Sequence, residues 1–93
     1  MAFTTDIQVN ADGWTPVTPR GGTNFVALQL KTTGPVLVQV APSDPGPQSM
    51  EGMLLYGGAI EDLPLPGLDV ADLVFLRSQE PDETNIVAAY VVT

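Results

Sequence analysis

The chain has 93 residues, and its eleven acidic against three basic residues give a formal net charge of −8. This acidity argues against direct binding to nucleic acid or to an anionic membrane surface, because both depend on Lys and Arg. The absence of cysteine and histidine excludes disulfides, zinc sites built from Cys or His, and Ser–His–Asp or Cys–His catalysis.

Length and composition predict one all-β domain over residues 1–93. Nine prolines and nine glycines are too many for long helices but suit short strands joined by turns. The N-terminus has neither the basic nor the apolar part of a signal peptide, and no stretch is long and apolar enough to span a membrane. We therefore expect a protein that is made and used without Sec export.

The N-terminal segment predicts a strand, a turn and a short edge element. Residues 3–9 alternate between apolar and polar side chains, as in a strand with one buried face. We expect residues 1–10 to form an extended strand or arm at the start of the domain. The run 10–13 contains Asp-Gly and predicts a turn. After it, residues 14–17 form an extended piece that Pro16 restricts to an edge or irregular position.

Residues 24–41 hold the clearest strand pattern. Apolar side chains recur at every second position in each half, namely Val26, Leu28 and Leu30, then Val36, Val38 and Val40. The halves are separated by the short polar run 31–34, which ends in Gly34. Two alternating segments joined in this way predict a β-hairpin, which we place at the centre of the domain.

The second half of the chain predicts a proline-rich loop and four more strands. The loop covers residues 42–49, where three prolines cannot join a sheet ladder. An acidic turn is expected at 79–84. The expected strands are 53–56, 59–63, 73–77 and 86–92, and a turn at 64–67 is expected to close the second of them. Strand 73–77 is apolar on both parities, as in a strand covered on both faces. The whole pattern predicts a single small antiparallel β-sandwich, jelly-roll-like, with seven or eight short strands.

Acidic residues offer the remaining candidates for chemistry. Carboxylates pair in sequence at residues 61–62 and at Asp69 with Asp72. A glycosidase needs two carboxyls across a sugar-sized cleft, which a sandwich of this size rarely has, so we expect no enzyme. Calcium is a second alternative for segment 62–72 or loop 80–83, but neither matches the EF-hand loop pattern. We expect these acids to be solvated surface charge, with no cofactor.

Trp14 admits two interpretations. It could stack on a sugar, with Tyr56 or Tyr90 beside it, as in a carbohydrate-binding module. More often, a single Trp near the start of a small sandwich caps the core or lies between protomers. We favour the second interpretation.

The chain also has more apolar residues than one sandwich needs. Phe25, Ala27 and Leu37 lie on the opposite parity from the regular apolar rows, as do Leu73 and Phe75, and in the last strand Ala89 and Val91 or their alternates. A lone sandwich should present polar side chains at such positions, and large apolar patches usually mark interaction surfaces. Either the chain's own loops cover these residues or another molecule does. We expect another molecule, either a second copy or a docked partner.

The order of these segments resembles a class of small β-sandwich virion proteins of tailed bacteriophages, of the head decoration, cement or fibre-base type. The resemblance runs from about residue 14 to residue 93, and the run Leu-Pro-Leu-Pro-Gly-Leu at 63–68 departs from it. The resembling parts are Trp14-Thr15-Pro16-Val17, the strand 24–30 with Gly34–Ala41, the loop 42–47, Gly52–Leu55, Ala59–Glu61, and the final pair 72–77 and 86–91.

The resemblance implies a non-enzymatic structural protein on the outer capsid surface of a virion, assembled in the host cytoplasm. Such a protein binds the major capsid protein through symmetric contacts and is a homo-oligomer, for which we favour a trimer. The alternative is a carbohydrate- or receptor-binding module of a phage tail or fibre. Segments 1–9 and 42–48 are the expected capsid contacts. The expected partner or oligomer interface residues are Phe3, Ile7, Trp14, Phe25, Leu37, Pro45 and Phe75.

Overall fold

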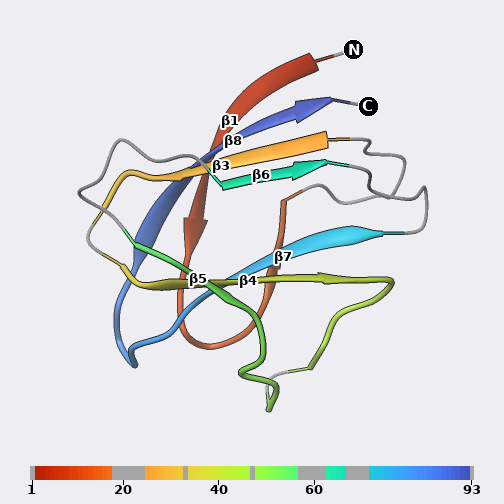
Figure 1. Ribbon diagram of the computed structural model, residues 1–93. Helices are drawn as coiled ribbons and strands as arrows, with labels where there is room; N and C mark the ends of the chain where they lie inside the picture. Colours follow the sequence, from red (N-terminus) through yellow and green to blue (C-terminus); the bar gives the residue numbers. More distant parts are fainter. Residues whose placement is uncertain are drawn as a thin grey trace.

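The computed structural model describes residues 2–17, 25–32, 34–46, 48–56, 63–66 and 72–92 (Figure 1). This part of the chain contains no helix, and therefore none that could cross a membrane. Its eight strands are β1 (Ala2–Val9), β2 (Thr15–Pro16), β3 (Phe25–Leu30), β4 (Val36–Ala41), β5 (Met53–Leu55), β6 (Leu63–Pro66), β7 (Leu73–Ser78) and β8 (Asn85–Val92).

The strands form two four-stranded antiparallel sheets that lie face to face (Figure 1). The first sheet has the order β1-β8-β3-β6 and the second has the order β2-β7-β4-β5. β1 pairs with β8, β2 with β7, β3 with β6 and β4 with β5. The pairs are therefore nested, because both strands of each pair lie between the two strands of the previous pair in the sequence. A long hairpin rolled into two sheets in this way is the jelly-roll arrangement. The predicted all-β sandwich is therefore confirmed.

Aliphatic side chains at alternate positions fill the space between the sheets. The predicted rows of β3 and β4 point inward, except that Val40 is exposed. Leu28 and Leu76 are completely buried, and burying one such side chain stabilises a fold by about 1.5–3 kcal/mol. The buried core consists of Val9, Val17, Val26, Leu28, Leu30, Val36, Val38, Leu55, Val74, Leu76, Val87, Ala89 and Val91.

β7 is buried on both faces, as its continuous apolar sequence predicts. On its outer face Phe75 packs with Trp14 and Leu37 in a second apolar cluster. The indole Nε1 of Trp14 donates a hydrogen bond to the Ser49 carbonyl at 3.1 Å, and Arg77 donates to the same oxygen at 3.1 Å. The segment before β2 and the loop after β4 are thus tied to the outer face of the second sheet.

The hairpin predicted over residues 24–41 is wrong. β3 and β4 are each strands, but they lie in different sheets and do not pair with each other. The backbone N–H of Lys31 donates to the Ile86 carbonyl at 2.8 Å, and that of Gly34 donates to Asn85 Oδ1 at 2.9 Å. Because the connection bonds to β8, it crosses between the sheets instead of turning back within one.

The turn predicted at 64–67 is wrong for residues 64–66, which belong to β6 and pair with β3. Proline has no backbone N–H, so two prolines are tolerated in β6 because it is an edge strand. Of the strand predicted at 59–63, only Leu63 is among the described residues, and the other four lie outside them.

Gly52 provides a first test of this packing. Its φ is +148°, and a Cβ at this position would lie 2.7 Å from the Val38 carbonyl oxygen. Because that neighbour is backbone, Gly52→Ala should lower the free energy of unfolding by about 1–3 kcal/mol, measured by urea denaturation. Gly13→Ala is the control, since a Cβ there meets nothing within 4 Å. Equal stability of the two variants would contradict this packing.

Candidate interaction surface

The outward face of the first sheet carries an apolar surface, which we call the outer sheet face. Sheet strands alternate their side chains, so residues opposite the core positions of β3 and β8 point away from the sandwich. Tyr90 is 43% exposed and Ile86 is 40% exposed. The other members are half-buried beside them. The outer sheet face consists of Phe25, Ala27, Ile86, Ala88, Tyr90 and Val92.

Small residues between large ones give this face its shape. Ala27 lies directly opposite Tyr90 across the β3–β8 ladder, and Phe25 lies opposite Val92. The rings of Phe25 and Tyr90 meet edge to face, with centroids 6.3 Å apart. Next to Tyr90, the alanines leave a shallow hollow of about 180 Å³. Its lining residues include Thr4, Ala27, Gln29, Ala88 and Tyr90.

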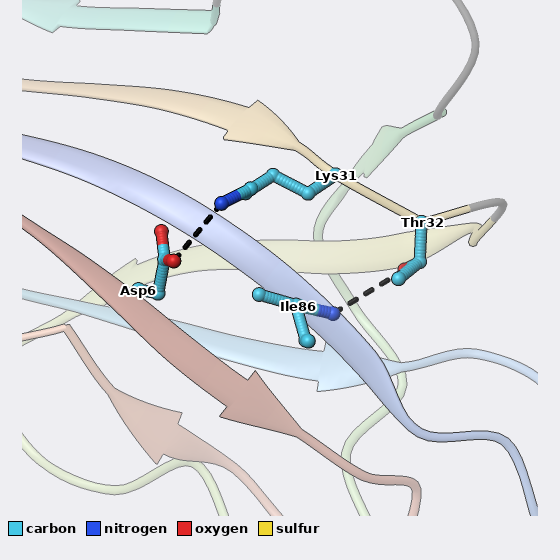
Figure 2. Close-up of polar contacts among 4 residues, drawn as sticks. All are labelled: Asp6, Lys31, Thr32 and Ile86. Carbon is cyan, nitrogen blue, oxygen red and sulfur yellow. Dashed lines mark hydrogen bonds and ion pairs between the residues drawn. The ribbon is translucent and has the colours of Figure 1, made fainter.

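An ion pair borders the outer sheet face. Lys31 follows β3 and reaches across β8 to Asp6 on β1, with 3.0 Å between Nζ and Oδ2 (Figure 2). Both side chains are exposed, so the pair contributes at most about 1 kcal/mol. Its main effect is to neutralise the one charged side chain of β1.

Other apolar side chains are exposed on the second sheet, on or beside its edge strand β5. These residues are Val40, Met50, Met53, Leu54 and Tyr56. They include Tyr56, the suggested neighbour of Trp14 in a sugar site, but neither Trp14 nor Phe75. In the described part of the molecule, large exposed apolar side chains therefore lie on the outer sheet face, around β5, and at Phe3 of β1.

Three of the predicted interface residues are already covered within the chain. Trp14, Leu37 and Phe75 are 7%, 3% and 3% exposed, because the segment before β2 and the loop after β4 close over them. For these three residues the chain itself supplies the cover, whereas the apolar residues around β5 stay exposed. Trp14 is also too buried to stack on a sugar unless this cluster opens.

The other four predicted interface residues are more accessible. Phe3 is exposed on β1, while Ile7 of the same strand is half-buried against the core. Phe25 is half-buried on the outer sheet face, and Pro45 is half-buried in the loop after β4. The structure thus brings Phe3, Ile7 and Phe25 onto the first sheet.

Sequence reasoning named Ala89 and Val91, or their alternates, as the outward row of the last strand, and it singled out Tyr90 only as a possible sugar contact. The signal was the strand 86–92, which is apolar on both parities. That pattern shows that one apolar row must face away from the core, but it does not show which row. The register with β3 settles this, since Val87, Ala89 and Val91 face the core.

The described residues contain no group of three or more acidic side chains that could hold a metal ion. Asp72 and the acidic loop 80–83 are among these residues. The other acids considered for catalysis or calcium, residues 61, 62 and 69, lie outside the described residues.

Comparisons of the chain with protein-family models, with curated proteins and with solved structures found no match.

Proposed function

We propose that the protein is a non-enzymatic structural protein of a phage particle, a decoration or cement protein that binds the outer surface of the head. In this proposal the outer sheet face docks on the major capsid protein. The observation that supports a docking role is the apolar row of β3 and β8, with Tyr90 43% exposed. A sandwich that worked alone would carry polar side chains there.

The shape and charge of the protein suit this role. The outer sheet face is broad and only shallowly hollowed, which suits a protein surface better than a small ligand. A net charge of −8 suits a position outside the shell, away from packaged DNA. At about 25 cal/mol per Å², an apolar contact of a few hundred Å² contributes several kcal/mol before the cost of association. Repetition over many equivalent sites then adds avidity.

The test is binding to capsids of the encoding phage assembled without this protein. The wild-type chain should sediment with them at micromolar concentration, and Ala27→Arg should bind about tenfold more weakly or worse. The substitution fills the hollow and forces an unpaired charge into the contact. Thr84→Arg, at an exposed position of the turn before β8, should bind like the wild type.

Two results would contradict the proposal. Absence of wild-type binding at micromolar concentration would argue against the decoration role altogether. Normal binding of a folded Ala27→Arg protein would show that the outer sheet face is not the docking surface.

A further inference from the structure

β1 is the longest open sheet edge in the described structure. Each sheet has two edge strands, and the other three are blunted in ways that prevent pairing with further strands. β2 has two residues including Pro16, β5 has three residues, and β6 contains Pro64 and Pro66. β1 has eight residues and no proline, and it lies at the edge of its sheet beside β8 (Figure 1).

The free side of β1 presents main-chain hydrogen-bonding groups. In an antiparallel pair, every second residue turns its N–H and C=O away from the neighbouring strand. β1 pairs with β8 along its whole length, from Ala2 with Val92 to Val9 with Asn85. Five of its eight residues are exposed. The edge is therefore a regular, accessible template for one more strand.

Charged side chains on an edge strand normally hinder pairing with a further strand, and here the one such charge is neutralised. Asp6 is the one charged residue of β1. Lys31 pairs with it from the opposite side of β8, so the pair lies over the sheet (Figure 2). The strand that meets this edge therefore meets no unpaired charge, even though the chain has a net charge of −8.

We propose that β1 pairs with β1 of a second copy, antiparallel about a two-fold axis at Thr5, so that the two first sheets become one continuous sheet. Core-facing residues of one copy then lie opposite core-facing residues of the other, and the outer faces of both copies lie on the same side of the shared sheet. Asp6 lies opposite Thr4 of the second copy, so the two carboxylates are not directly opposed. Thr5 lies opposite itself, a favourable cross-strand pair.

Phe3 supports this register. Its side chain points to the same side of the sheet as those of Ile7 and Val9, toward the core. It is nevertheless 42% exposed, because its one cross-strand neighbour is Val91 of β8. In the proposed dimer, Phe3 lies opposite Ile7 of the second copy. Each aromatic ring then gains an apolar neighbour on its open side, and the contact extends both cores across the shared edge.

Solution mass provides the first test. Light scattering should give twice the 9.8 kDa mass of one chain for the wild type and the mass of one chain for Phe3→Lys. Met53→Lys is the matched control, because Met53 is 47% exposed on the edge strand of the other sheet, and it should remain a dimer. A wild-type mass of one chain, or of three chains as in the trimer favoured from the resemblance, would overturn the proposal. So would a dimer that survives Phe3→Lys or is lost in Met53→Lys.

Cross-linking tests the register. The chain has no cysteine, so one introduced cysteine can form a disulfide only with another copy. Thr5→Cys should form a covalent dimer about tenfold faster or more than Gln8→Cys under mild oxidation, because only position 5 lies opposite itself. Equal rates would overturn the proposed axis. Neither test uses capsids, so failure of the dimer and failure of capsid binding are distinguishable.

Discussion

Replacing Asn85 with alanine should lower the free energy of unfolding by about 2–4 kcal/mol. The side chain is 1% exposed and connects the ends of four strands. Its Oδ1 accepts hydrogen bonds from Thr32 Oγ1 and from the Gly34 backbone N–H, and its Nδ2 donates to Ser78 Oγ at 3.0 Å. Alanine would remove all three bonds and leave the Gly34 N–H without its acceptor, and urea denaturation would measure the loss.

The network around Asn85 extends to the first and last strands. Ser78 Oγ donates to the Val9 carbonyl at 3.1 Å, and Thr32 Oγ1 accepts the Ile86 N–H at 3.3 Å (Figure 2). These bonds join the end of β1, the β3–β4 connection and the β7–β8 turn. We expect the network to hold the two sheets in register at this end of the sandwich, because its members come from both of them.

Two variants separate this role from general effects of substitution. Thr84→Ala changes an exposed neighbour and should shift stability by less than about 0.5 kcal/mol. Asn85→Asp keeps an acceptor for Gly34 but loses the donor to Ser78 and buries a charge, so it should be no more stable than Asn85→Ala. If Asn85→Ala unfolds at the wild-type urea concentration, the network does not stabilise the fold.

The sequence predicted strands better than their partners. Alternation in 24–30 and 36–41 correctly indicates which side chains of β3 and β4 face the core, apart from Val40. It contains no information on whether two neighbouring strands share a sheet, because both arrangements bury the same parity. In the structure, Gly34 in the connection between these strands is hydrogen-bonded to the side chain of Asn85, 51 residues away in the sequence. No local pattern could reveal it.

The prolines of β6 show a second limit of predicting strands from sequence. The run 63–66 has the composition of a turn, and proline is normally evidence against a strand. In the structure it pairs with β3 on the side away from β8, and this edge position does not require every N–H. The prediction failed because the edge position of this segment is a property of the whole fold.

The sequence predicts that some apolar side chains lie outside the core, but it does not predict where the resulting surface lies. An excess of apolar residues is visible in the sequence, and it correctly indicates that some row must lie outside the core. In the second sheet Leu37 and Phe75 are covered by the segment before β2 and the loop after β4, whereas the first sheet leaves Phe25 and Tyr90 on the outside. Which residues are covered depends on where these two segments fold, and Trp14 and Arg77 hold them together by donating to one carbonyl, that of Ser49.

Trp14→Ala should therefore lower the free energy of unfolding by about 3–5 kcal/mol. The substitution removes the largest member of the cluster over β7 and the hydrogen bond to Ser49, and it exposes Leu37 and Phe75, which are otherwise 3% exposed each. Because the chain has one Trp, far-ultraviolet circular dichroism should follow the urea transition. Trp14→Phe keeps an aromatic ring without the indole N–H, so its loss should be smaller, about 1–2 kcal/mol.

Tyr56→Ala is the matched control, since Tyr56 is 60% exposed and its removal should change stability by less than about 0.5 kcal/mol.

The comparison also separates the two roles considered for Trp14. A platform for sugars would tolerate alanine in the fold and lose only glycan binding. A residue that holds the covering loop in place would lose stability first, and the newly exposed Leu37 and Phe75 should make the folded fraction bind a hydrophobic dye. Wild-type stability of Trp14→Ala would contradict the second role and return Trp14 to the list of ligand contacts.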